Sequence, residues 1–133
     1  MTNEPEYELQ LQNLQYYEQR NCKRADLPLD DQSKSRFVRA ACYLESLPMA
    51  QNQAQTVGLL ASIAENVSIA HGMSRSEATW WRTYIDLNNH YYYFKSTLVP
   101  TIFWLNYATI DFSNPASYRE INAHDTELIG DIT

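Results

Sequence analysis

Glycine, proline and cysteine are all scarce in this sequence, with 3, 5 and 2 residues among 133. The sequence has no repeat and no low-complexity run, and no apolar stretch approaches the roughly 20 residues that a membrane-spanning helix needs. The polar, acidic start of the chain does not resemble a signal peptide. A single pair of cysteines cannot build a framework of several disulfides. The length fits one modest globular domain with a core of its own.

Basic residues are also in deficit, since 10 Lys and Arg stand against 16 Asp and Glu, which gives a formal net charge of −6. A nucleic-acid-binding protein needs a basic stripe to displace the counterions of the phosphates. A protein that binds a membrane surface needs a polybasic segment, and the sequence has neither. Nucleic acids and membranes are therefore excluded as expected partners.

The sequence lacks the spacing of metal ligands. Cys22 and Cys42 lie twenty residues apart, and His71, His90 and His124 are far from one another and from both cysteines. We interpret the cysteines as structural or buried thiols and expect no metal. The common motifs of serine hydrolases, nucleotide-binding proteins and zinc proteases are missing too.

Helical patterns occupy two segments of the chain. Residues 33–47 begin with Ser33 and Ser35, either of which can serve as an N-cap, and end before Pro48. The apolar stripe expected to face inward in this segment consists of Phe37, Ala40, Ala41 and Leu44. A second helix fits residues 50–67. The leucines of residues 7–17 alternate with polar residues in a way that fits a short strand or a helix equally well.

Aromatic and β-branched residues dominate the second half of the sequence. Residues 79–87 and 90–95 flank the pair Asn88-Asn89, and asparagine tolerates a positive φ, so this region predicts a β-hairpin. Residues 101–105 predict a third antiparallel strand, and residues 113–133 an acidic, loosely packed tail. The fold class is therefore α+β. The aromatic residues expected to share one sheet face are Trp80, Trp81, Tyr84, Tyr92, Phe94 and Trp104.

Four stretches of the sequence carry a resemblance to a known family. Residues 2–14 read T-N-x-P-x-Y-x-x-Q-L-x-N-L, and residues 33–41 read S-x-S-R-F-V-R-A-A. Residues 79–94 contain T-x-W-x-x-x-x-D-L followed by Y-Y-Y-F, and residues 104–112 begin with Trp and end with Asp-Phe. In this order they resemble the choloylglycine hydrolase family, which contains conjugated bile acid hydrolases and penicillin V acylases.

The resemblance implies that residues 1–133 form a single partial domain, the C-terminal portion of an αββα N-terminal-nucleophile hydrolase. In that family a cysteine at the start of the mature chain attacks a linear amide, and its own α-amino group serves as the base. The acyl-enzyme is a thioester, and no metal or organic cofactor is needed. Because Cys22 and Cys42 are internal, this resemblance implies that the nucleophile is not present in the chain.

Two site residues follow from the resemblance. Asn3 matches the family asparagine whose side-chain amide helps to hold the oxyanion of the tetrahedral intermediate. Arg36 matches the active-site arginine near the nucleophile, where a fixed cation favours the thiolate. Arg39 has no role in the family and is expected to form a structural ion pair.

The resemblance leaves the substrate open among penicillin V, bile-acid conjugates and N-acyl homoserine lactones, and the compartment open between the periplasm and the cytoplasm of a bacterium. Half of a sandwich exposes one sheet face, so we expect the chain to self-associate or to depend on a partner, and to lack amidase activity alone. One alternative is a degenerate, non-catalytic half-domain that acts as a binding or interaction module. Another is an enzyme in which removal of Met1 makes Thr2 the nucleophile.

Overall fold

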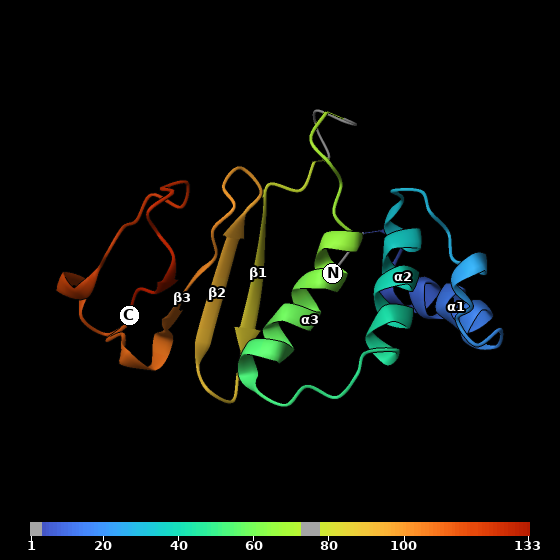
Figure 1. Cartoon of the computed structure of the whole chain (residues 1–133), viewed down its shortest axis with the longest axis horizontal. Coiled ribbons are helices and arrows are strands. Elements are labelled where there is room, and N and C mark those ends of the chain that lie inside the picture. Colours follow the sequence, from blue (N-terminus) through green and yellow to red (C-terminus); the bar gives the residue numbers. More distant parts are fainter. Residues whose placement is uncertain (1–3, 73–77) are drawn as a thin grey trace. The chain divides into compact units, whose positions relative to one another are not determined.

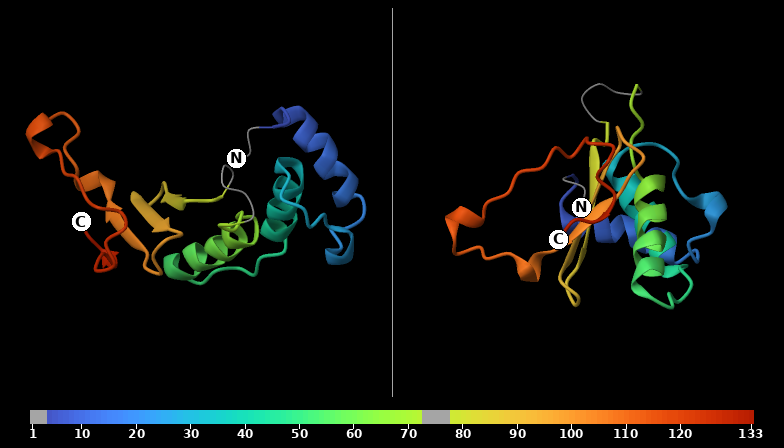
Figure 2. Two further views of the ribbon diagram at one scale, coloured as in Figure 1. Left: turned by 90° about the horizontal axis from the view of Figure 1, so that it is seen from above. Right: turned by 60° about the vertical axis from the view of Figure 1, so that its left-hand side comes forward.

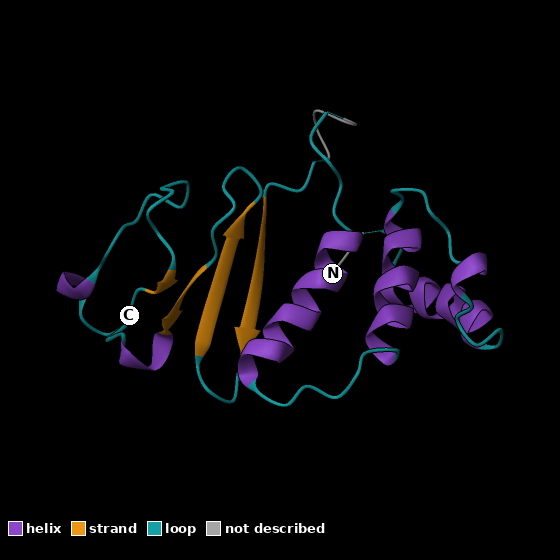
Figure 3. Ribbon diagram, viewed as in Figure 1, coloured by secondary structure: helices purple, strands orange, loops and turns teal. Residues whose placement is uncertain are grey.

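The structure, a computed structural model, describes residues 4–72 and 78–133 (Figure 1). The chain divides into two compact units, residues 1–74 and residues 75–133. The α-helices lie in the first unit and the strands in the second (Figure 3). The α+β composition predicted from the sequence is confirmed. None of the described helices is both long enough and apolar enough to cross a membrane.

The first unit contains three α-helices: α1 (Tyr7–Glu18), α2 (Ser33–Glu45) and α3 (Gln53–Asn66). The last two confirm the predicted helices. The helix α2 begins at the predicted residue and ends two residues early, whereas α3 begins three residues late and ends one residue early. The expectation of two helices is corrected to three, because the segment that fitted a strand or a helix forms α1. In α3 the side chain of Asn52 accepts a hydrogen bond from the Gln55 backbone at 2.9 Å, which caps the start of the helix.

The inner face of α1 explains why its apolar pattern was ambiguous. The helix residues that are not exposed are Gln10, Asn13, Leu14 and Tyr17, which follow the helical spacing i, i+3, i+4, i+7. Two of these four are amides, whereas Leu9 and Leu11 point outward and are 50% and 42% exposed. The buried positions of α1 therefore repeat with the period of a helix, whereas its apolar residues do not.

The buried face of α2 differs from the predicted one. Its buried residues are Ser35, Val38, Arg39 and Cys42, rotated from the expected stripe, and Leu44 of that stripe is 55% exposed. The serine N-cap is also wrong, because Gln32 occupies the cap position and makes no side-chain capping bond. The Asp30 carboxylate instead accepts a hydrogen bond from the Gln32 backbone at 2.9 Å.

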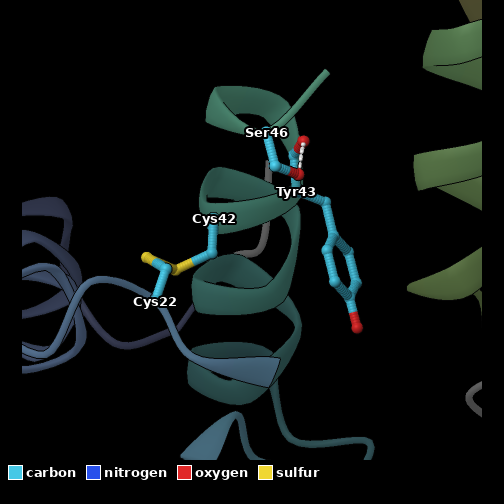
Figure 4. The surroundings of a disulfide bond; sticks show 4 residues. All are labelled: Cys22, Cys42, Tyr43 and Ser46. Atoms are coloured by element: carbon cyan, nitrogen blue, oxygen red, sulfur yellow. Dashed lines mark hydrogen bonds between the residues drawn. A yellow bond between two sulfur atoms is a disulfide. The ribbon is translucent and has the colours of Figure 1, made fainter. Parts of the chain in front are cut away.

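A disulfide decides which face of α2 turns inward. Cys22 and Cys42 are bonded, with their Cα atoms 5.5 Å apart (Figure 4), so the interpretation of the two cysteines as thiols is wrong. Cys42 belongs to a small core with Leu27 and Val38. Leu14 and Tyr17 of α1 pack against this core. The bond thus attaches the segment after α1 to the buried side of α2.

The second unit is a four-stranded sheet in the order β1-β2-β3-β4. The strands β1 (Trp81–Asp86), β2 (Tyr91–Ser96) and β3 (Phe103–Asn106) are antiparallel neighbours, which confirms the predicted hairpin and third strand. Asp86 closes the hairpin turn, because its carboxylate accepts hydrogen bonds from the backbones of Asn88 and Asn89. The positive φ that we assigned to the asparagine pair belongs to His90, at 62°.

The strand register separates the aromatic residues onto two faces. Tyr84 lies opposite Tyr93, which lies opposite Trp104, whereas Ile85 lies opposite Tyr92 on the other face. Side chains alternate along a strand, so the six aromatics cannot all share one face, and that expectation is wrong. Trp81, Tyr92 and Phe94 lie on one face, Tyr84 and Trp104 on the other, and Trp80 precedes β1.

The acidic end of the chain returns to the sheet. After β3 the chain makes a long excursion and comes back beside that strand (Figure 2). There β4 (Gly130–Asp131) pairs parallel with β3, and the Gly130 backbone donates to the Ile102 carbonyl at 3.0 Å. Within the excursion, the His124 ring lies 3.0 Å from the hydroxyl of buried Ser96. The segment predicted as a loose tail thus ends in sheet pairing, which makes the sheet mixed.

Candidate functional site

Of the two predicted site residues, the structure describes Arg36, and Asn3 lies outside the described residues. Arg36 stands one turn into α2 and is half-buried. Its Nε donates a hydrogen bond to the Asp31 carbonyl at 3.1 Å. Within the ranges 4–72 and 78–133, no residue accepts a hydrogen bond from its two terminal nitrogens. One edge of the guanidinium is thus held by the chain, and the other edge remains available to an anionic group.

Arg39 has a different environment from Arg36, although it lies on the same helix. It is 4% exposed, and one terminal nitrogen donates to the carbonyls of Pro28 and Asp30, both at 2.7 Å. Arg39 therefore holds the loop before α2 in place. We expected a structural ion pair for Arg39, whereas its hydrogen bonds go to main-chain carbonyls.

The Asp30 carboxylate completes this loop. The Gln32 backbone N–H and the Ser35 hydroxyl, both hydrogen-bonded to it, lower the pKa of Asp30 below its usual value, and the charge of Arg39 lowers it further. A carboxylate at this position also lies at the N-terminal end of α2, where the helix dipole favours a negative charge. The loop and the first turn of α2 are thus fixed as one piece, and this piece carries Arg36.

The two family-like stretches of the first unit contact each other. The Gln10 side-chain nitrogen donates to the Glu4 carbonyl at 3.0 Å and lies 3.5 Å from the Ser33 hydroxyl. The rings of Tyr7 and Phe37 meet edge to face, with centroids 6.4 Å apart. The segment that begins with Glu4, the residue after Asn3, therefore lies against the start of α2.

Asn13 adds a second polar link between the same stretches, because its side-chain nitrogen donates to the Lys34 carbonyl at 3.4 Å. The sequence analysis did not identify Gln10 and Asn13 as residues that join these two stretches. The available signal was their spacing of three residues inside the first family-like stretch, which places both amides on one helix face. The resemblance assigns Asn3 and Arg36 to one active site, and their proximity stays a prediction.

The remaining chemistry of the described residues is limited. No group of three or more His, Cys, Asp and Glu residues within the described ranges is arranged to hold a metal ion. Both cysteine sulfurs are consumed in the disulfide, so neither is a thiol that could attack a substrate. A hollow of about 680 Å³ in the first unit is bordered by Leu27, Leu29, Asp31 and Arg39, and it does not include Arg36.

The chain is similar to known proteins over most of its length. Residues 1–118 match the family described as linear amide C–N hydrolases, choloylglycine hydrolase family. A penicillin V acylase of Pectobacterium atrosepticum is 28% identical over 130 residues, which covers 85% of this chain and 34% of that protein. The solved structure of penicillin V acylase from Agrobacterium tumefaciens aligns with a TM-score of 0.77 and 27% identity, over 98% of this chain and 44% of that one.

The chain thus spans about a third of the Pectobacterium relative and less than half of the Agrobacterium acylase. Its three helices and mixed sheet match part of the N-terminal-nucleophile hydrolase fold of penicillin V acylase. Because the family match extends over most of its residues, the chain belongs to the choloylglycine hydrolase family of linear amide C–N hydrolases.

Proposed function

We propose that this chain is the part of a linear-amide hydrolase that supplies the oxyanion donor Asn3 and the cation Arg36, while the nucleophile comes from residues outside this sequence. The observation that carries the proposal is the contact between the two family-like stretches. Gln10 bonds the residue after Asn3 and reaches the helix start that bears Arg36. These contacts bring Glu4 and the start of α2 together, and they support a shared site for Asn3 and Arg36.

The proposed chemistry is acyl transfer to a cysteine. A thiolate attacks the amide carbonyl, and the side-chain amide of Asn3 donates a hydrogen bond to the oxyanion that forms. The C–N bond then breaks, the amine leaves with a proton from the α-ammonium group of the nucleophilic residue, and a thioester remains. Water cleaves the thioester and releases the acid. The available edge of Arg36 favours the thiolate over the thiol before attack.

The disulfide supports an external nucleophile. Cys22 and Cys42 are bonded to each other, and both are internal residues without a free α-amino group. A second cysteine-bearing segment must therefore complete the centre. For the same reason we propose that the chain alone does not hydrolyse amides, and that residues 1–133 are one partial domain.

Penicillin V is the substrate that the relatives favour, because both named relatives are penicillin V acylases. Bile-acid conjugates and N-acyl homoserine lactones contain the same linear amide and remain competing substrates. Disulfides persist in oxidising compartments, so the Cys22–Cys42 bond favours the periplasm over the cytoplasm.

Association with a second chain or a second copy is part of the proposal. Trp81 and Ile85 lie on the same face of β1 and are 60% and 56% exposed. Large apolar side chains that are exposed on one sheet face are characteristic of a surface that another chain covers. The same exposed face would serve the alternative function, a non-catalytic interaction module.

A chimera distinguishes these functions. In the acylase from Agrobacterium tumefaciens, the segment that this chain matches is replaced by residues 1–133, and release of the amine from penicillin V is followed. The chimera is expected to hydrolyse penicillin V, whereas the purified 133-residue chain is expected to be inactive. Asn3→Ala should lower kcat more than it raises KM, because the oxyanion forms on the way to the transition state.

The outcomes distinguish three hypotheses: part of a hydrolase, a non-catalytic module, and an enzyme with Thr2 as its nucleophile. A folded chimera without activity, checked by its far-UV spectrum and a cooperative melting transition, would favour the non-catalytic module. Activity of the 133-residue chain that is lost when its N-terminal amine is blocked would favour Thr2 as the nucleophile. Activity of the chimera alone supports the proposed function.

A further inference from the structure

We infer that Gln10 is a positioning residue for the proposed active centre, which it serves by fixing the Glu4 carbonyl against the first turn of α2. This inference rests on the proposed function. Gln10 is 2% exposed, which is unusual for a glutamine, because a buried amide loses its hydrogen bonds to water. Its side-chain nitrogen reaches the Glu4 carbonyl at 3.0 Å and the Ser33 hydroxyl at 3.5 Å.

The contact joins three points that are distant in the sequence. Gln10 is six residues after Glu4 and twenty-three before Ser33. Ser33 begins α2, and Arg36 follows it by three residues, so the two lie on adjacent turns of the same helix face. One buried side chain therefore sets the distance from the Glu4 carbonyl to the helix turn that presents Arg36.

Fixing Glu4 matters because one peptide bond joins it to Asn3. A side chain that donates to an oxyanion must be held within a few tenths of an ångström of its productive position, since small misplacements cost large factors in rate. In the proposed reaction Gln10 is not one of the groups that act on the substrate. Its effect on catalysis must therefore act through the segment that it holds.

Asn13 provides a matched control. It lies one turn further along the same face of α1 and also donates to the start of α2, at the Lys34 carbonyl. Its hydrogen bond goes to Lys34 and not to Glu4. If the two amides only hold α1 on α2, their substitutions should affect kinetics alike, whereas a positioning role belongs to Gln10 alone.

The first experiment measures the contact in the 133-residue chain itself, without any activity. Hydrogen–deuterium exchange is followed in the peptide that covers residues 4–9 for Gln10→Met and Asn13→Leu. Gln10→Met is expected to accelerate exchange in this peptide, and Asn13→Leu to leave it unchanged. Equal exchange in both variants and the parent chain would overturn the inference, whatever the chain catalyses.

The second experiment measures kinetics in the active chimera, at temperatures below the melting transition of every variant. Gln10→Met is expected to lower kcat at least about tenfold with KM changed less than about twofold, and Asn13→Leu to change neither by that much. Gln10→Glu has no donor while its carboxylate is charged, but it has an O–H donor when protonated. The loss of kcat in this variant, relative to the parent chimera, should therefore shrink as the pH falls.

The results distinguish a failure of the proposed function from a failure of the positioning role of Gln10. An inactive parent chimera contradicts the proposed function, and the exchange experiment still decides whether Gln10 holds the Glu4 segment. Equal kinetic losses in Gln10→Met and Asn13→Leu, or a Gln10→Glu deficit that does not depend on pH, would show that Gln10 only packs the helices and would overturn the positioning role.

Discussion

A single nitrogen of Arg39 reaches the Asp30 carbonyl at 2.7 Å, and the charge of the same guanidinium helps to lower the pKa of the Asp30 carboxyl. The loop before α2 is thereby held through both its backbone and its side chain. Arg36, three residues earlier, donates to the Asp31 carbonyl, and its terminal nitrogens bond to no other described residue. The two arginines of one helix thus have separate tasks, one in stability and one in the proposed chemistry.

Substitution of Arg39 should therefore destabilise the first unit more than substitution of Arg36. Arg39→Met removes two charged hydrogen bonds from a buried site and should lower the free energy of unfolding by about 2–3 kcal/mol. Arg36→Met should cost less than about 1 kcal/mol, because the residue is half-exposed. Urea unfolding followed at 222 nm reports the first unit, since all described α-helices lie there. Equal losses would contradict the division of tasks.

The stability of the loop should depend on acid. Folding lowers the pKa of Asp30, chiefly through the Gln32 backbone N–H. Its contribution is therefore present above the unfolded pKa near 3.8 and is lost as the pH falls through the lower folded pKa. Asp30→Asn should reduce stability at pH 6, and the difference from the parent should vanish towards pH 2. Asp31→Asn removes the same charge from the adjacent residue and serves as the control. A pH-independent difference would count against this account.

Loss of the Cys22–Cys42 bond should weaken the first unit. The bond closes a loop with a sequence separation of 20, and its removal should lower the free energy of unfolding by about 3 kcal/mol. The double variant Cys22→Ser/Cys42→Ser and the chemically reduced parent should unfold at the same urea concentration. Alkylation of the unreduced protein under denaturing conditions should label no thiol. Two labelled cysteines in protein from an oxidising compartment would show that the bond is not formed.

The exposed face of β1 should drive association. Trp81→Thr combined with Ile85→Thr keeps the strand-forming tendency but removes the apolar surface, so the sedimentation coefficient at micromolar concentration should fall towards that of a monomer. Leu29→Ser removes an apolar residue that is 84% exposed in the first unit, and it should leave association unchanged. A parent chain that is already a monodisperse monomer would exclude association through this face.

Local patterns predicted most of the elements. The hairpin, the third strand and the helices α2 and α3 each have a periodicity or a turn signal that does not depend on the rest of the chain. The faces that side chains occupy were harder to predict, because they depend on partners distant in sequence. The buried face of α2 follows from the bond between Cys22 and Cys42, and nothing in a spacing of twenty residues reveals that bond.

The candidate site was only partly accessible from the sequence. Arg36 follows from a family resemblance, whereas its neighbours do not. Gln10 and Asn13 are buried or half-buried amides on α1, and hydrophobic patterning treats such residues as exposed. Their hydrogen bonds to Glu4, Ser33 and Lys34 join segments that only the fold brings together. The parallel pairing of β4 with β3 was not predicted either, because a strand of two residues is too short to show an alternating pattern.

The central claim is that Arg36 stabilises a thiolate supplied from outside this sequence, and the pH dependence of cysteine alkylation in the active chimera tests it most directly. The rate of iodoacetamide reaction with the nucleophilic cysteine reports the pKa of its thiol. In Arg36→Met that pKa should rise by about 1 unit or more, since an adjacent cation lowers the pKa of an acid by roughly 1–3 units. Arg39→Met should leave it unchanged. An unchanged thiol pKa in Arg36→Met, with penicillin V hydrolysis at the rate of the parent, would contradict the account.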